Sequence, residues 1–292
     1  MKADIRFIAG GGRLPLTVFI HGIGVNADFW AEPSRARVLG GKYPLSILLP
    51  KGAEPVTSYT DLARLGFSVL TWSQSRPAGP IAIAVAELRG IMSEYSRFGR
   101  NGILLVCHSR GGLVARKYLE ECELPKLVVT IATPHQGSSM AKWAAFISPL
   151  ASALRQALDN IGKKDADTAL RRILGFLGSE GLRELLPGSA FYEGLNDTKK
   201  AARYISIGGT DPDLLKSAAV AIPELLMKVI PERIFPEEMR AGEGDGLVTA
   251  ASSVLPYGDE HRDYQLNHAS LLFDREVRNF IAEEAGRFLR TD

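Results

Sequence analysis

Ser109 lies in a pattern that can turn a serine hydroxyl into a nucleophile. The apolar run Ile103–Cys107 (ILLVC) predicts a strand directly before it, and a helix is predicted after it. A serine at such a tight strand–helix turn takes a strained backbone that lifts its hydroxyl clear of the sheet. Small residues are needed two positions away on either side, and Gly111 meets this demand. Cys107 stands where glycine is usual, and we expect it to be a buried packing residue. The alternative is a serine N-cap on an ordinary glycine-rich turn.

A second glycine-rich turn could stabilise the negative charge that develops on a carbonyl oxygen during acyl transfer. His21-Gly22-Ile23-Gly24 follows the apolar run Leu16–Ile20 (LTVFI). Glycines let the main chain bring its N–H groups close to such an oxygen. We expect the amides of Ile23 and Arg110 to be the two donors, and His21 to be a hydrogen-bonding residue of the loop. Alone, the motif is more often a simple turn.

A nucleophilic serine needs an imidazole to take its proton. Of the five histidines, His21 and His108 belong to the two turns already described, and His135 lies in the turn-like sequence ATPHQGS. His261 lies in the charged run GDEHRD, where we expect it to be solvated. His268 lies between a short strand-like run and the last predicted helix, and this position favours it as the base.

The imidazole in turn needs a carboxylate that holds it in the right tautomer. Asp245 lies in the glycine-flanked loop GEGDG, ahead of His268. Asp211 follows the predicted strand YISIGGT more closely, and Asp213 is a further candidate. Each of these could instead be the side chain of an Asx turn.

Short β-branched runs alternate with helical stretches, which predicts an α/β fold with a largely parallel sheet covered on both faces. Strands are predicted at Leu16–Ile20, Phe67–Thr71, Ile103–Cys107, Leu127–Ile131 and Tyr204–Ile207. Helices are predicted at Ile81–Tyr95, Leu113–Glu121 and Phe273–Leu289.

Two further stretches carry apolar residues at helical spacing but no strands. We expect a single domain, 1–292, with a helical cap at 138–200 and a second helical insertion at 213–238. Substrate is expected to contact the apolar stripes of these insertions at Trp143, Ile147, Leu150 and Leu225. The alternative is that these helices are ordinary covering helices.

The composition is that of a globular protein with a full core, because 46 % of the 292 residues are hydrophobic and 23 % are charged. The net charge of +2 comes from 35 basic and 33 acidic residues spread along the chain, which excludes a clustered basic surface for nucleic acid. Two cysteines do not suggest a disulfide scaffold. No apolar run is long enough for a signal peptide or a membrane span, so the cytoplasm is the default location, with a processed secreted form as the alternative.

Taken together, these motifs resemble those of bacterial lipases and esterases of the α/β-hydrolase superfamily. The resemblance extends from His21 to the C-terminus: LVVTIATPHQGS is similar to the strand and loop after the nucleophile helix, and LLPGSAFYEGLN to the end of the lid region. RYISIGGT, GDGLVTAASS and Asn267-His268 are similar to the late strand, the acid loop and the base loop, in the family's order. This order places Asp245 ahead of Asp211.

The resemblance implies an α/β-hydrolase fold with an inserted lid, and a triad of Ser109, Asp245 and His268. It implies hydrolysis of acylglycerols or other lipid-like carboxylic esters through an acyl-enzyme. The expected partners are this small-molecule ester or lipid and, transiently, a lipid interface; no protein partner is inferred. The alternatives are an acyltransferase or phospholipase with the same triad, or a catalytically silent lipid-binding module.

Two departures from the family pattern limit what the resemblance implies. Calcium-binding relatives carry an aspartate two residues after the catalytic histidine, where this chain has Ser270. Relatives with a disulfide place its second cysteine in the acid loop, where this chain has Ala251. We therefore expect no metal, no cofactor and no such disulfide. Arg110 is uncommon after a nucleophile, and we expect it to narrow or charge the pocket mouth.

Overall fold

The computed structural model describes residues 4–39, 55–139, 178–214, 232 and 235–289. Its strands form a seven-stranded sheet in the order β1-β3-β2-β4-β5-β6-β7. The strands are β1 (Asp4–Ile8), β2 (Leu16–Ile20), β3 (Ser68–Ser73), β4 (Ile103–His108), β5 (Pro125–Ile131), β6 (Arg203–Gly209) and β7 (Glu260–Tyr264). β1 pairs antiparallel with β3, and every other neighbouring pair is parallel.

The central strands are apolar on both faces because helices cover both sides of the sheet. Every residue of β2 and β4 is buried. Leu105 and Cys107 of β4 pack into the core on one face, whereas Leu104 and Val106 pack into the core on the other. Continuous apolar runs of this kind are typical of strands buried on both faces of a parallel sheet.

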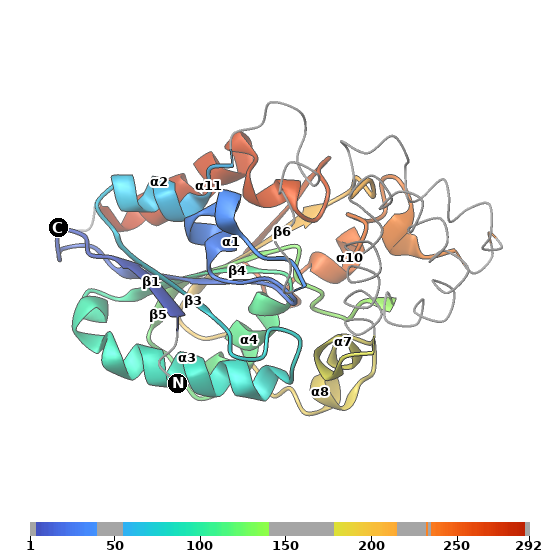
Figure 1. Cartoon of the computed structure of the whole chain (residues 1–292), viewed down its shortest axis with the longest axis horizontal. Coiled ribbons are helices and arrows are strands. Elements are labelled where there is room, and N and C mark those ends of the chain that lie inside the picture. The colour runs from blue at the N-terminus through green and yellow to red at the C-terminus, as the bar shows by residue number, and fades with distance from the viewer. Residues whose placement is uncertain (1–3, 40–54, 140–177, 215–231, 233–234, 290–292) are drawn as a thin grey trace, which may run out of the picture.

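Two layers of helices enclose the sheet (Figure 1). One layer holds α3 (Ile81–Glu94) and α4 (Arg110–Leu119), and the other holds α1 (Asp28–Ala31), α2 (Ser58–Arg64) and α11 (Arg275–Gly286). The side chain of Asp274 caps α11 by accepting hydrogen bonds from the amides of Glu276 and Val277. Three short helices, α7 (Glu180–Glu184), α8 (Ala190–Glu193) and α10 (Ala250–Ser253), lie in loops.

The predicted elements match the observed ones to within a few residues. β2 has the predicted bounds, and α3 ends one residue before its predicted end. The helix predicted to begin at Leu113 already begins at Arg110, because Gly111 and Gly112, which weaken a helix on propensity alone, continue the turn at Ser109. The final helix splits into α11 and a 3₁₀ turn at Arg287–Leu289.

Two strands at the sheet edges were not predicted. β1 has no fully buried residue, and β7 has the polar sequence EHRDY, so neither shows the apolar signal of a core strand. His261, which we expected to be solvated, lies in β7 with 21 % of its side chain exposed, and its Nδ1 is 2.8 Å from Ser206 Oγ of β6. Pairing with β6 leaves this ring only partly exposed, and its Nε2 lies 3.1 Å from Asp263 Oδ1.

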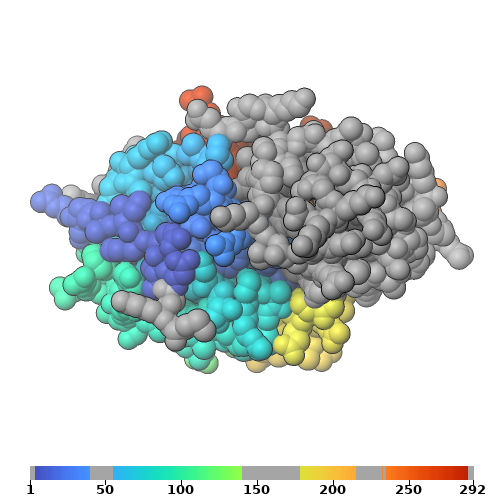
Figure 2. Space-filling view, viewed as in Figure 1, coloured from blue at the N-terminus to red at the C-terminus, as the bar shows by residue number. Residues whose placement is uncertain are grey.

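The expected cap falls largely outside the described residues. Trp143, Ile147, Leu150 and Leu225 all lie there. Within the described part of the interval 138–200, the chain forms α7 and α8. Figure 2 shows these residues, in yellow, lying against the cyan segment that begins α3.

Candidate active site

Ser109 takes the strained backbone that a nucleophile turn requires. Its φ of 53° and ψ of −129° lie where residues with a side chain are rarely found, at a cost of about 1–3 kcal/mol. Three hydrogen bonds hold it there: its N–H donates to Ile131 O (2.8 Å), and its carbonyl accepts from Gly112 N (3.0 Å) and Thr133 Oγ1 (2.9 Å). The loop after β5 thus fixes the turn after β4.

The two glycines after Ser109 have no room for a side chain. A Cβ at Gly111 would lie 2.4 Å from the carbonyl oxygen of Ile20, and one at Gly112 would lie 2.2 Å from Thr133 Oγ1. Cys107, on the other side, is fully buried in the core between the sheet and α3 and α4. Burial raises the pKa of its thiol, so it is a packing residue and not a reactive thiolate.

The loop after β2 comes directly against Ser109. A Cβ at Gly22 would lie 3.0 Å from the Cβ of Ser109, which explains the glycine. Gly24 has a φ of 73°, and its N–H donates to Pro77 O at 2.9 Å. Arg110 is the first residue of α4, so its N–H has no carbonyl partner within that helix. The loop of Ile23 and the amide of Arg110 therefore flank the same serine.

His21 is a structural residue of this loop. Its Nδ1–H donates to Gly22 O (2.8 Å), and its Nε2 accepts from Gln74 N (3.2 Å). Burial, together with the nearby positive charge of Arg110 and against the effect of the hydrogen bond to Gly22, lowers its pKa to about 4. The ring is therefore neutral near pH 7, with its proton on Nδ1.

The structure brings Asp245 and His268 together. Asp245 Oδ2 lies 2.8 Å from His268 Nδ1, and its other oxygen accepts from the amides of Leu247 (2.9 Å) and Val248 (2.8 Å). Because the carboxylate accepts from Nδ1–H, the neutral imidazole has an unprotonated Nε2, which is the form that a general base requires. Both side chains are buried.

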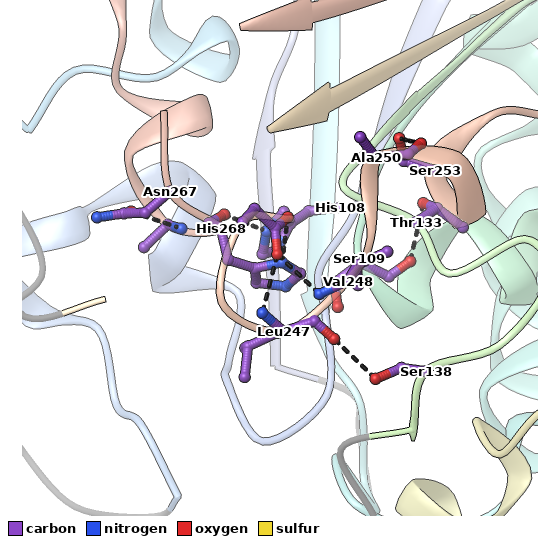
Figure 3. A network of polar contacts seen from close by, with 12 residues as sticks. His108, Ser109, Thr133, Ser138, Leu247, Val248, Ala250, Ser253, Asn267 and His268 are labelled. Atoms are coloured by element: carbon purple, nitrogen blue, oxygen red, sulfur yellow. Dashed lines mark hydrogen bonds and ion pairs between the residues drawn. The ribbon is translucent and has the colours of Figure 1, made fainter. Parts of the chain in front are cut away.

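His108 connects the nucleophile turn to the base. Its Nε2–H donates to the carbonyl of His268 (3.0 Å), and the two ring centroids are 4.8 Å apart. Figure 3 shows His108 beside His268, with Leu247 and Val248 of the loop of Asp245 next to them. The described hydrogen bonds include none between Ser109 and His268 Nε2. Such a bond often tightens only when substrate binds.

Asn267, immediately before the base, organises its loop. Its Oδ1 accepts from Ala269 N (3.2 Å), Ser270 N (2.9 Å) and Ser270 Oγ (2.7 Å), and its Nδ2 donates to Asp213 O (2.6 Å). The Asn-His pair was visible in the sequence, but this role depends on a contact across 54 residues. Ser270, at the position of the calcium-ligating aspartate of some relatives, is a partner of Asn267.

The loop of the other two aspartates contacts the residues before His268: Asp211 N donates to Leu266 O (3.3 Å), and Asp213 O accepts from Asn267 Nδ2 (2.6 Å). The carboxylate of Asp211 accepts from the amide of Asp213 (3.0 Å), which is the Asx turn considered as an alternative. His135 is buried, and its Nε2 lies 2.9 Å from Thr130 Oγ1. Neither Asp211 nor His135 has a described hydrogen bond to His268.

The expectation for Arg110 is wrong. Its side chain has no exposed surface, so it does not line the pocket mouth. Instead, its guanidinium donates to Gln74 Oε1 and to Gly79 O, both at 2.6 Å. Both acceptors lie in the segment between β3 and α3.

The sequence model of the alpha/beta hydrolase family matches residues 17–241. The chain belongs to this family. The match includes Ser109 and the loop of Ile23 but ends before Asp245 and His268, so the pairing of these two residues is an observation of the structure itself. No curated protein matches the sequence.

Solved structures share the fold of this α/β hydrolase at low sequence identity. The Bacillus licheniformis lipase BlEst2 is 17 % identical in its propeptide form, with a TM-score of 0.59, and 20 % identical in its mature form, with a TM-score of 0.53. The alignment covers 98 % of this chain but 54 % of the propeptide form, and 96 % of this chain and 97 % of the mature form.

Enzymes with other named activities have folds that match this chain at similar TM-scores. BpoC of Mycobacterium tuberculosis, named as a non-heme bromoperoxidase, is 14 % identical over 100 % of this chain and 97 % of its own, with a TM-score of 0.53. The 2-hydroxy-6-oxo-6-phenylhexa-2,4-dienoate hydrolase of a Rhodococcus strain is 15 % identical over 98 % of this chain and 100 % of its own, with a TM-score of 0.51. At these identities the likeness shows the fold alone.

The described residues bear on metal binding and membrane insertion in two ways. They contain no cluster of three or more His, Cys, Asp or Glu side chains that could hold a metal ion. No helix in the described ranges is both long and apolar enough to cross a membrane.

Proposed function

We propose that this α/β hydrolase is a serine carboxylic-ester hydrolase of lipase or esterase type, with Ser109, Asp245 and His268 as its triad. The observation that carries the proposal is the 2.8 Å pair between Asp245 and His268, which lies beside a strained serine at the head of α4. Asp245 and His268 are 23 residues apart and lie in different loops, so they meet only because the fold brings them together.

The reaction would proceed through an acyl-enzyme. Ser109 Oγ forms a bond to the ester carbonyl carbon while its proton passes to His268 Nε2, and Asp245 stabilises the resulting imidazolium. The amides of Ile23 and Arg110 would donate to the carbonyl oxygen as it becomes negative. Collapse of this intermediate breaks the bond to the alcohol, which takes the proton from His268. Water then repeats the sequence and releases the acid.

We propose lipid-like esters, such as acylglycerols, as the substrate class. The resemblance of the loops after β5 and around Asp245 to those of lipases supports this choice, and BlEst2 carries the name lipase. The bromoperoxidase and the C–C hydrolase among the neighbours mark the competing reactions on this fold. The proposed cap, 138–200 and 213–238, would supply the apolar lining.

Labelling by a fluorophosphonate, combined with turnover of p-nitrophenyl esters from acetate to palmitate, tests the proposal. Wild-type protein should form one covalent adduct at Ser109 and hydrolyse these esters. Ser109→Ala should lose labelling and nearly all turnover at an unchanged Tm, because removing one hydroxyl leaves no core cavity. Wild-type protein that neither labels nor hydrolyses any ester would contradict the proposal.

A further inference from the structure

We propose that Arg110 and Gln74 are positioning residues of the oxyanion hole. The Arg110 side chain, acting through Gln74, would fix the loop His21–Gly24 relative to the nucleophile turn. This inference rests on the proposed function for its catalytic meaning, but the geometry behind it can be tested without turnover.

Burying the guanidinium of Arg110 beside the nucleophile turn has a large desolvation cost. Arg110 has no exposed surface, and burial lowers its pKa to about 10, against the opposing effect of the carboxylates of Glu184 and Glu87. The side chain therefore remains a cation near pH 7. An apolar side chain of similar volume would fill the same space without that cost. Because packing alone does not require a charged side chain here, we infer that the hydrogen bonds of Arg110 have a specific role.

The guanidinium determines how the Gln74 amide is oriented. Arginine has donors only, so the oxygen of the Gln74 side chain must face Arg110 Nη1, at 2.6 Å. The Gln74 NH₂ group then faces the other way and donates to the carbonyl of His21 at 3.1 Å. Without the cation, the buried amide oxygen of Gln74 would have no donor, and the side chain would no longer be held against the His21 carbonyl.

Gln74 holds His21 at two points. Besides the side-chain bond to the His21 carbonyl, the backbone N–H of Gln74 donates to His21 Nε2 at 3.2 Å. His21 Nδ1–H closes the loop on Gly22 O at 2.8 Å. The chain of contacts therefore runs from Arg110 through Gln74 and His21 to the residue before Ile23.

Both expected oxyanion donors thus depend on one residue. The backbone N–H of Arg110 is one donor, and its side chain fixes the loop that carries the other, Ile23. A second bond, from Arg110 Nη2 to Gly79 O (2.6 Å), holds the far end of the segment 74–79. Since electrostatic stabilisation depends on donors placed in advance, the spacing between these two amides should control the rate.

Helix α7 supports the same segment from outside. Glu184 accepts from Ile81 N at 2.7 Å, and Gly181 N donates to Ala78 O at 3.0 Å. Figure 2 shows this contact between the yellow and cyan surfaces. The segment 74–81 is therefore held on both sides.

Four variants test the inference: Arg110→Met, Arg110→Lys and Gln74→Glu, with Arg116→Met as the matched control. Arg116 is a second buried arginine on α4, but it pairs with Asp197 and donates to the carbonyl of His135 (2.9 Å), and none of its described hydrogen bonds reaches the segment 74–79. Gln74→Glu keeps the acceptor for Arg110 and removes the donor to His21. We expect Arg110→Met and Gln74→Glu to lower kcat about 10- to 100-fold at a KM within about twofold of wild type. Arg110→Lys should recover part of the loss.

Two readouts separate positioning from a merely structural role. Affinity for a trifluoromethyl ketone, whose bound oxyanion needs both amides, should fall in parallel with kcat in Arg110→Met and Gln74→Glu. Hydrogen exchange should rise in peptides that cover 20–25. Arg116→Met should lower Tm while leaving exchange at 20–25 unchanged, because its hydrogen bonds go to Asp197 and His135.

The failures are distinguishable. If Arg110→Met and Gln74→Glu leave exchange at 20–25 as in wild type, the positioning role is overturned, whether or not the protein turns over esters. If exchange rises but kcat and inhibitor affinity of a labelling-competent enzyme do not change, the link to the oxyanion hole is overturned. Absence of fluorophosphonate labelling in the wild type contradicts the proposed function. In that case, hydrogen exchange at 20–25 still tests whether Arg110 and Gln74 position the loop His21–Gly24.

Discussion

At the residue scale, the two candidate acids, Asp245 and Asp211, differ in their hydrogen-bond partners. Two backbone amides occupy one oxygen of Asp245, which leaves the other for His268, whereas Asp211 caps the amide of Asp213. Asp245→Asn would present an amide to His268 Nδ1 and favour the wrong tautomer. We expect it to lower kcat by about three to four powers of ten, by analogy with the serine-protease triad.

Asp211→Asn is the control, because an asparagine can still accept from the amide of Asp213. It should retain kcat within a few fold of wild type. Steady-state kinetics with p-nitrophenyl butyrate, corrected for folded fraction by Tm, compares the two variants. An inactive Asp211→Asn beside an active Asp245→Asn would move the acid to the loop directly after β6.

Single residues differ in how far their positions could be predicted from the sequence. Ser109 and the His21 loop are local patterns, because strand, glycines and helix all lie within a few residues. Arg110 was misplaced because a long side chain follows whichever acceptors the fold brings near, and Gln74 lies 36 residues away. The contact of His108 with the carbonyl of His268 spans 160 residues, and no local pattern carries it.

At the element scale, the junction of β4 and α4 leaves no room for a side chain at the second residue after Ser109. Gly111→Ala would place a Cβ 2.4 Å from the carbonyl oxygen of Ile20, a backbone atom of a central strand that cannot easily move. We expect a loss of about 1–3 kcal/mol in unfolding free energy, as for other overpacked sites. Activity should fall as well, because the strain is applied to the turn itself.

Gly90→Ala is the matched substitution within α3. An added Cβ there meets nothing within 4 Å, and the residue lies inside the helix. Alanine should stabilise it by about 0.5–1 kcal/mol, because glycine loses more conformational entropy on folding. Urea denaturation of both variants measures the two shifts, and equal values for them would show that the close approach at Gly111 is not what limits the junction.

Strands that are buried on both faces were easier to predict from the sequence than strands at the sheet edges. β2 and β4 carry continuous apolar runs, and each was predicted within one residue of its bounds. β1 and β7 pair on one side only and carry polar residues that face solvent, so their pairing with strands far along the chain decides their structure. The insertions at 138–200 and 213–238 remain predictions, since their apolar stripes lie mostly outside the described residues.

At the scale of the whole molecule, the parallel sheet explains why the candidate site is assembled from distant parts of the sequence. Ser109 follows β4, Asp245 lies in the long loop after β6, and His268 follows β7. The carboxyl ends of parallel strands lie at the same edge of a sheet, where ligands of open α/β folds bind. The three candidate residues therefore come to the same edge of the sheet without any local sequence relation.

Three histidines that this assembly buries couple its stability to pH. Burial lowers the pKa of His21 to about 4 and lowers those of His108 and His135 well below the ordinary 6.5. A folded-state pKa below the unfolded value means that the unfolded chain binds more protons in the window between the two. The contribution of these histidines to the unfolding free energy is therefore fully present above about pH 6.5. It decreases as the pH drops toward 4.

The expected loss is about 3 kcal/mol for His21 alone across its window from 6.5 to about 4, at roughly 1.4 kcal/mol per pH unit. Urea denaturation at pH 7.5, 6.0 and 5.0 measures the slope, and the range stops before most carboxylates protonate. His135→Gln should flatten it, because glutamine keeps a donor for Thr130 Oγ1 but does not titrate. An unfolding free energy that stays constant from pH 7.5 to 5.0 in the wild type would mean that these rings are hydrated or can protonate in place.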